Sequence, residues 1–251
     1  MPRRRLLGGI ALGALSFATA SLRGRERADA SAAEPPALLR RDPTERERWL
    51  AMHDAYVARS QRGELAAVLL GDSLTYGWLQ NGRAVYERTY APRRIEPFGI
   101  GGDRTADLLW RVAHGELSGP APRVVVVLIG TNDLASGPDD VIAGIRACLE
   151  AIRSAVPMAS VLLLGLLPRG DGDGGALVRR EIGAINRAIA RFDNGYTVRA
   201  LDIGTAFERA DGTVDPALYE PDLLHLSAEG YAAWARAMAP LLGSMLARSA
   251  R

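Results

Sequence analysis

The sequence has few of the residues that cross-link a chain or bind metal. Cys148 is the only cysteine among 251 residues, so no intrachain disulfide can form. It lies on an apolar stripe with helical spacing, which favours a buried, unreactive thiol. The three histidines, His53, His114 and His225, are scattered, and the chain has no H-E-x-x-H motif and no Cys/His cluster. The sequence therefore predicts no metal and no other cofactor.

Long apolar runs are also scarce, and the main one lies at the amino terminus. Arg3-Arg4-Arg5 precedes a run rich in Leu, Ala and Gly from Leu6 to Leu22, and a small-residue cleavage site follows at Ala28-Asp29-Ala30. This pattern is typical of a bacterial export signal over residues 1–30. Both the twin-arginine and the general secretory route fit it. We expect an exported protein, periplasmic or extracellular, with no stable membrane span once the signal is cleaved; a retained anchor is the alternative.

The charge balance gives no support for a nucleic-acid partner. Removal of residues 1–30 takes away six arginines and two acidic residues, which changes the net charge from +2 to −2. Arginine pairs elsewhere, such as Arg40-Arg41, have acidic neighbours and are expected to form solvated faces. A composition of 48% hydrophobic and 24% charged residues is ordinary for a soluble protein with one sizeable core.

After the signal, residues 31–43 read as a linker with the string Glu34-Pro35-Pro36, and a single domain is expected over 44–251. Helical and strand patterns then alternate. Helices are predicted over 44–61, 83–89, 105–113, 138–155, 177–192 and 228–247, and strands over 66–71, 93–98, 123–130, 160–167 and 197–203. This alternation, with strands that are apolar throughout, predicts an α/β fold whose five-stranded parallel sheet is covered by helices on both faces.

Three side chains suggest a nucleophile with its base. Gly71-Asp72-Ser73-Leu74 follows the apolar run of a predicted strand, which would hold Ser73 at the carboxyl edge of the sheet. Much later, Asp222 stands three residues before His225. A serine hydroxyl needs a base to take its proton and a third group to orient that base. The sequence therefore predicts a serine hydrolase in which Asp222 orients His225 toward Ser73.

Two further segments could stabilise the oxyanion that such a reaction creates. Gly101-Gly102-Asp103-Arg104 follows one predicted strand, and Gly130-Thr131-Asn132-Asp133 follows another. The backbone N–H groups of Gly102 and Ser73 and the side-chain amide of Asn132 are the predicted donors. Arg104 borders the predicted oxyanion glycine, so it either contacts substrate or forms a structural ion pair.

With these four blocks in order, the sequence from about Trp49 to Leu242 resembles the SGNH, or GDSL, hydrolase family. Within that family it is most similar to the platelet-activating-factor acetylhydrolase catalytic subunits and their bacterial relatives. The strings that carry this similarity are Phe98-Gly99-Ile100-Gly101-Gly102-Asp103, Leu109-Trp110-Arg111 with Gly115-Glu116-Leu117, Gly165-Leu166-Leu167-Pro168-Arg169-Gly170 and Leu224-His225-Leu226. The resemblance implies the three-layer α/β/α sandwich of the flavodoxin-like SGNH fold and the same catalytic residues.

The resemblance also implies a preference for short acyl groups, with acetyl the leading choice. Leu74 and Leu224 flank the nucleophile and the base, where they could close the acyl pocket. An α/β-hydrolase is disfavoured because the Ser73 motif lacks the second glycine of Gly-x-Ser-x-Gly. The substrate is expected to be a small-molecule or carbohydrate ester. Two alternatives stay open: an O-acyltransferase that acts on a carbohydrate hydroxyl, and a non-catalytic carbohydrate-binding protein.

Overall fold

The computed structural model describes residues 34–170 and 172–248. Within them, one compact unit begins at Pro35. The predicted export signal over residues 1–30 lies outside the described residues and stays a prediction. In the part of the chain that is described, no helix is long and apolar enough to cross a membrane.

A five-stranded parallel sheet forms the centre of the unit. Its strands are β1 (Ala67–Gly71), β2 (Ile95–Gly99), β3 (Val124–Leu128), β4 (Ser160–Leu164) and β5 (Val198–Leu201), in the order β2-β1-β3-β4-β5. Every residue of β1 and β3 is buried, as their continuous apolar sequences require for strands covered on both faces. This strand order is that of the flavodoxin-like folds. The predicted fold class is confirmed.

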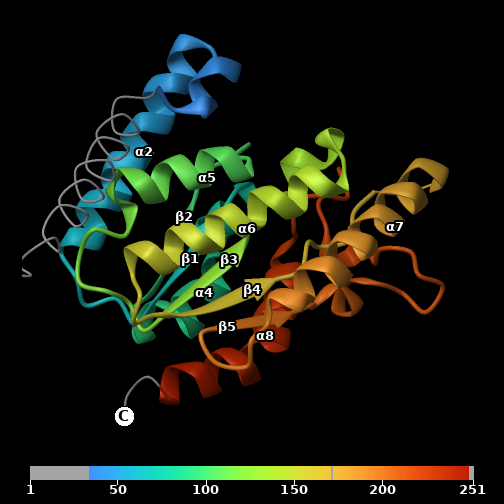
Figure 1. Cartoon of the computed structure of the whole chain (residues 1–251). Coiled ribbons are helices and arrows are strands. Elements are labelled where there is room, and N and C mark those ends of the chain that lie inside the picture. Colours follow the sequence, from blue (N-terminus) through green and yellow to red (C-terminus); the bar gives the residue numbers. More distant parts are fainter. Residues whose placement is uncertain (1–33, 171, 249–251) are drawn as a thin grey trace, which may run out of the picture. The chain divides into compact units, whose positions relative to one another are not determined.

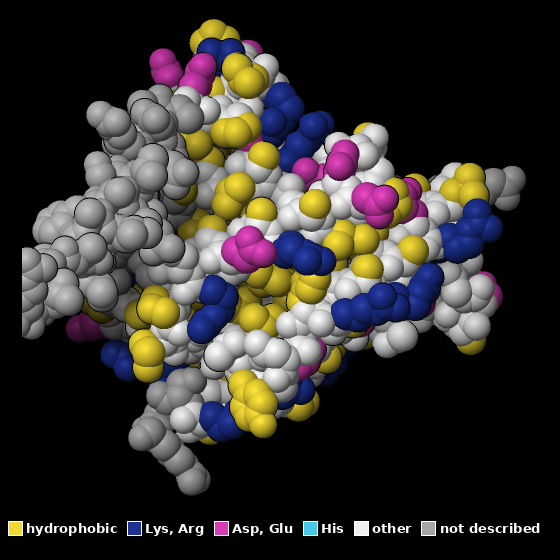
Figure 2. Space-filling model, viewed as in Figure 1, with side chains coloured by type: hydrophobic (Ala, Val, Ile, Leu, Met, Phe, Trp, Pro, Cys, Tyr) yellow, Lys and Arg dark blue, Asp and Glu magenta, His cyan; other side chains and the backbone are white. Residues whose placement is uncertain are grey.

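Helices cover both faces of the sheet (Figure 1). On one face α5 (Thr105–Arg111), α6 (Pro138–Ala155) and α7 (Gly172–Ile189) pack side by side, and α2 (Pro43–Gln61) packs next to them against the π-helical turn Val112–Glu116. On the other face α4 (Arg83–Thr89) packs against α8 (Ala228–Arg248). The short helix α3 (Ser73–Tyr76) follows β1 directly. Over α5, α6 and α7, basic and acidic side chains mingle with apolar ones (Figure 2).

Two boundaries differ from the sequence prediction by five residues or more. Residues 36–40, predicted within a linker, form a 3-10 turn whose Ala37 and Leu38 pack with Trp49 and Ile100, so the compact unit starts before residue 44. Helix α7 begins at Gly172 rather than near 177, although glycine is a weak helix former. At residues 36–40, burial of Ala37 and Leu38 outweighs a local composition that is typical of a linker.

Because all five strands are parallel, their carboxyl ends meet at one edge of the sheet. The loop after β1 carries Ser73, the loop after β2 carries Gly102, and the loop after β3 carries Asn132. Strand order places β1 between β2 and β3, so Ser73 lies between the other two loops. The sheet thus brings residues distant in sequence to one edge, as open α/β folds commonly do at their ligand sites.

Candidate active site

Ser73 lies on a tight turn between β1 and α3. The Asp72 carboxylate accepts a hydrogen bond from Leu74 N–H at 2.9 Å and so fixes the first turn of the helix. Gly99 lets β2 pass close beneath this turn, because a Cβ atom there would come within 2.2 Å of Tyr76 N. On the other side, Tyr231 of α8 donates to Leu74 O at 2.8 Å. The nucleophile position is therefore held by backbone contacts on two sides.

Ser73, His225 and Asp222 form a continuous hydrogen-bonded chain. The Oγ of Ser73 lies 2.9 Å from Nε2 of His225, and Nδ1 of His225 lies 2.6 Å from Oδ2 of Asp222. The structure thus brings together the three side chains that the sequence singled out across 152 positions. The order of atoms is the one that base-assisted activation of a serine needs.

A turn on the chain before α8 shapes the Asp222–His225 pair. Oδ1 of Asp222 accepts from the backbone N–H groups of Leu224 and His225 at 3.0 and 2.9 Å, which leaves Oδ2 for the ring. Burial would raise the pKa of the Asp222 carboxyl, but these hydrogen bonds outweigh it and hold the pKa below its usual value. Asn81 steadies the turn by donating to Leu226 O at 3.1 Å. The carboxylate is therefore ionised and aimed at the imidazole.

The loops after β2 and β3 flank Ser73 and are joined to each other. Gly102 has a φ of 74°, a conformation that favours glycine, and no hydrogen bond within the described chain occupies its N–H. The amide of Asn132 donates to Asp103 O at 2.8 Å, which leaves its second N–H free to bind another acceptor. Asp133 completes the link because it accepts from Thr105 N–H at 3.0 Å. The predicted donors thus lie on one connected frame.

Sequence reasoning missed the buried cation that supports this frame. Arg111 is fully buried and donates to Gly71 O at 3.1 Å and Phe98 O at 2.5 Å, the carboxyl ends of β1 and β2. It also forms ion pairs of 2.6 Å with Asp103 and with Glu116. Burial favours its neutral form, but these two carboxylates raise the pKa of the guanidinium above its usual value, so it stays charged. Arg111 and Glu116 lie in two of the strings that carry the family resemblance, but those strings do not show that the two side chains form a buried ion pair.

Asp72 is the other charged group beneath the nucleophile. Its side chain is fully buried, and Oδ2 has no hydrogen-bond partner within the described residues. Burial raises the pKa of Asp72 to about 7, and the Asp103 carboxylate adds to the rise, although Leu74 N–H and His225 oppose it. Through its bond with Leu74 N–H, Asp72 stabilises the turn that carries Ser73.

We expect Asp72→Asn to change how stability depends on pH. Between its ordinary pKa near 4 and about 7, Asp72 is protonated in the folded chain and ionised in the unfolded one, so wild-type stability falls as pH rises through that window. Asparagine does not titrate. From pH 5 to pH 8 the free energy of unfolding of the wild type should therefore fall by about 2 kcal/mol relative to that of the variant. Urea unfolding at both pH values measures this; a difference independent of pH contradicts it.

The three predicted substrate-binding residues lie in different surroundings. Leu74 is buried in the main core at 2% exposure. Leu224 is half-buried and lines a hollow of about 300 Å³ together with Arg169, Val178 and Asp222. Arg104 lines a separate hollow next to Gly102 and Asn132. Leu224 and Arg104 therefore line two separate hollows.

The described residues hold no cluster of three or more His, Cys, Asp or Glu side chains that could bind a metal ion. His53 is buried against Trp49 and Trp110, and burial lowers its pKa to about 4. Cys148 is buried too, at 0% exposure, as its spacing predicts. These residues are packing groups.

Comparison with known proteins agrees with this geometry. Residues 69–233 match the GDSL-like Lipase/Acylhydrolase family. Platelet-activating factor acetylhydrolase IB subunit alpha1 of Rattus norvegicus is 36% identical over 203 residues, which is 80% of this chain and 85% of that protein. Subunit alpha2 of Gallus gallus is 31% identical over 203 residues, again 80% of this chain and 86% of the relative.

A solved structure of a GDSL-like lipase from Bacteroides thetaiotaomicron has the same fold. The TM-score is 0.61 at 19% identity, over 76% of this chain and 97% of that one. The family match covers both Ser73 and the Asp222–His225 turn. The chain belongs to the GDSL-like lipase/acylhydrolase family and is a carboxylic ester hydrolase.

Proposed function

We propose that the protein hydrolyses esters of short acyl groups, acetyl above all, through an acyl-Ser73 intermediate. The observation that carries this proposal is the hydrogen-bonded chain Asp222–His225–Ser73, at 2.6 and 2.9 Å. Strand order places Ser73 between the loops of Gly102 and Asn132. A base within hydrogen-bond reach of the nucleophile and donors opposite it are what acyl transfer requires.

In the first half-reaction, Ser73 Oγ attacks the ester carbonyl carbon while Nε2 of His225 takes its proton. The resulting oxyanion is bound by Ser73 N–H, Gly102 N–H and the free N–H of Asn132. His225 then gives the proton to the departing alkoxide, and the alcohol leaves. Asp222 keeps the imidazole oriented and stabilises its charged form throughout.

In the second half-reaction, His225 takes a proton from water, which attacks the carbonyl carbon of the acyl-serine. The bond between that carbon and Ser73 Oγ then breaks, His225 returns the proton to Ser73 Oγ, and the acid leaves. The side chains of His225 and Asp222 are 43% and 49% exposed, so water reaches the base directly. That access favours hydrolysis over transfer to a sugar hydroxyl, which would require water to be excluded. The partition of acetyl groups between water and an added acetyl acceptor, followed by product analysis, tests the choice.

The preference for short chains is proposed from Leu224, which lies next to the base and lines a hollow of about 300 Å³. Rates on p-nitrophenyl acetate, butyrate, octanoate and palmitate test it. Each methylene beyond the optimum should meet packed side chains, at a cost of about 1 to 3 kcal/mol. An optimum at octanoate or longer would reject the short-acyl proposal while leaving the esterase assignment intact.

We expect Leu224→Ala to move the optimum from acetyl toward butyryl esters, because removal of the side chain enlarges the space beside His225. The ratio of kcat/KM for butyrate to that for acetate should rise by about tenfold. Leu50→Ala, an exposed leucine on α2 that does not line this hollow, is the matched control and should leave the ratio unchanged. If Leu224→Ala lowers activity on every ester alike, Leu224 supports the turn and does not bound the acyl group.

A further inference from the structure

A hollow of about 530 Å³ borders the two loops that hold the oxyanion donors. Its lining is rich in N–H donors, because it includes three guanidinium groups and one side-chain amide but only one carboxylate. The lining side chains come from Arg40, Arg41, Glu45, Arg104 and Asn132, with Gly102 between them. Arg40, Arg41 and Glu45 belong to the segment before residue 69, where the family match begins. The hollow is thus built partly by the amino-terminal turn and α2.

Arg40 and Arg41 are fixed in place by buried groups. Arg40 pairs with Asp107, whose side chain is fully buried, and retains 30% exposure. Arg41 donates to Gly101 O at 2.7 Å and lies 3.4 Å from Oδ1 of the fully buried Asp103. These carboxylates offset much of the two charges, so both arginines act as oriented donors on the wall of the hollow. The prediction that Arg40-Arg41 forms a solvated face is therefore wrong.

Arg104 differs from both because its guanidinium has no hydrogen bond or ion pair among the described residues. Its backbone N–H is bonded to Asp107 at 2.8 Å, which fixes the Cα position. Its charge acts on the Asp133 carboxyl, but both oxygens of that group are already bonded to Thr105. Arg104 therefore offers five unused donors and a positive charge beside Asn132.

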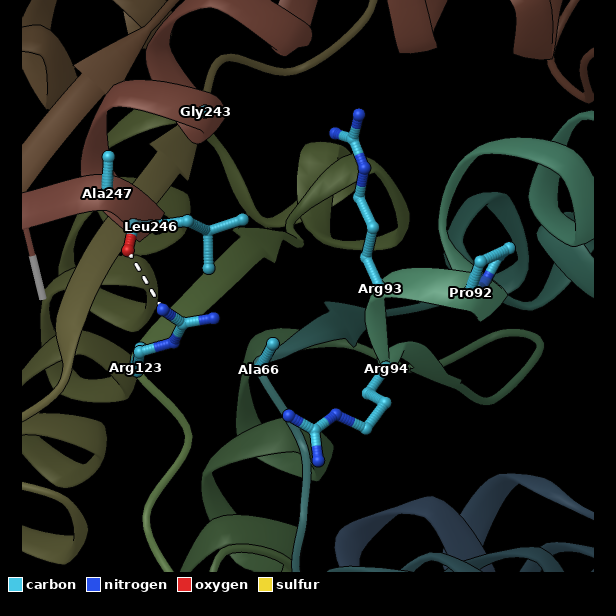
Figure 3. A pocket seen from close by; sticks show the side chains of 8 residues that line it. All are labelled: Ala66, Pro92, Arg93, Arg94, Arg123, Gly243, Leu246 and Ala247. Atoms are coloured by element: carbon cyan, nitrogen blue, oxygen red, sulfur yellow. Dashed lines mark hydrogen bonds between the residues drawn. The ribbon is translucent and has the colours of Figure 1, made fainter. Parts of the chain in front are cut away.

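A second hollow is also lined by arginines, and their arrangement differs from that of Arg40, Arg41 and Arg104 (Figure 3). It lies at the amino ends of the strands, and Arg93 and Arg94 extend in different directions there. Arg123 donates to Leu246 O at 3.1 Å near the end of α8, where a cation satisfies a helix carbonyl. In that hollow the side chains of Arg93 and Arg94 point apart, so they do not present their donors to one common anion.

We propose that the hollow of Arg40, Arg41 and Arg104 binds an anionic group, a carboxylate or a phosphate, on the alcohol portion of the ester. This inference rests on the proposed esterase function of Ser73. The hollow shares no lining residue with the hollow of Leu224, where the acyl group is placed, so the alcohol portion is the part that can reach it. The fixed guanidinium groups of Arg40 and Arg41 match the planar carboxylate and the phosphate oxygens, and the unpaired guanidinium of Arg104 can turn toward the same anion.

The test compares esters of equal size and different charge. We would measure kcat/KM for 4-acetoxybenzoate and for its neutral counterpart 4-acetoxybenzamide, with the acetyl ester of 4-hydroxyphenyl phosphate as the phosphate arm. Arg104→Gln should lower the ratio of anionic to neutral kcat/KM by about tenfold. Glu45→Gln removes the one carboxylate that faces the hollow and should raise that ratio about twofold.

Arg191→Gln is the matched control. Arg191 lies on the turn Ala190–Phe192 ahead of β5, at the opposite edge of the sheet, and is exposed. It should leave the ratio unchanged. Added NaCl should shrink the wild-type ratio toward that of Arg104→Gln, because salt screens an exposed charge. The larger of the carboxylate and phosphate effects identifies the preferred anion.

Binding without turnover separates this proposal from the esterase function. Calorimetric titration of Ser73→Ala with 4-hydroxybenzoate and with 4-hydroxyphenyl phosphate should give a Kd that Arg104→Gln weakens by about tenfold. If no ester is hydrolysed but this binding holds, the proposed function fails and the anion site stands. If esters are hydrolysed and the ratio and both Kd values are the same with and without Arg104, the anion site is refuted.

Discussion

Ser73→Ala should abolish ester hydrolysis while the fold stays intact. The covalent step depends on one hydroxyl, which lies 2.9 Å from the only side chain placed to take its proton among the described residues. Loss of a nucleophile of this kind lowers kcat by about 10⁴-fold or more. The steady-state rate on p-nitrophenyl acetate and labelling by a fluorophosphonate probe measure the loss, and circular dichroism with thermal unfolding reports on the fold.

Ser227→Ala is the matched control for that experiment. The Ser227 hydroxyl donates to Ala217 O at 2.8 Å and accepts from Gly230 N–H at 3.2 Å, at the start of α8 just after the base. Its removal should lower stability by about 1 kcal/mol and leave most of the activity. Retained turnover in Ser73→Ala would remove Ser73 from its assigned role, and an equal loss in both variants would assign the effect to a disturbed base loop.

The sheet and the catalytic side chains could be predicted because their signals are local. Strand β3 is a run of four valines and a leucine, and such a run is apolar in any context. Ser73, Gly102 and Asn132 each follow a strand directly, and parallel strands end at one edge. Asp222 and His225 are three residues apart, so a single turn joins them. None of these inferences needed to know which distant residues touch.

The supporting contacts could not be predicted because they join distant parts of the chain. Arg41 reaches Gly101 across 60 positions, and Trp49 donates to Asp103 across 54. Asp103 stands just before a predicted helix, where a carboxylate commonly caps the first turn, but its side chain accepts from Arg111 and Trp49. Asp133 accepts from Thr105 N–H instead. In the sequence, a carboxylate just before a helix is equally compatible with capping that helix and with pairing with a distant cation. Only the fold decides which donors surround it.

The amino-terminal boundary shows the same limit. Glu34-Pro35-Pro36 and the arginines that follow have the composition of a linker, but Ala37 is fully buried and Leu38 nearly so. They pack with Ile100, which stands beside the oxyanion loop. Burial of these few apolar side chains is enough to order a short segment that its own sequence would leave unfolded. Because this segment has a defined conformation, Arg40 and Arg41 lie beside the oxyanion loop.

Asn132→Ala should lower kcat by about 10²- to 10³-fold with little change in KM. One N–H of the Asn132 amide is committed to Asp103 O, so the other is held in a fixed direction before substrate arrives. Such a donor binds the oxyanion of the tetrahedral intermediate more strongly than the neutral carbonyl, and its loss therefore appears in kcat. Rates on p-nitrophenyl acetate over a range of concentrations separate the two constants.

The bond to Asp103 gives Asn132 a structural role as well, which the control must exclude. Asn81→Ala removes an amide that holds the base loop through Glu220 and Leu226 and does not lie on the oxyanion loops. It should cost about tenfold or less, and Asn132→Ala should show a similar loss of thermal stability but a much larger loss of kcat. If the two variants lose kcat equally, the amide of Asn132 holds its loop and does not bind the oxyanion. If the loss in Asn132→Ala appears only in KM, the amide binds the ground-state ester instead.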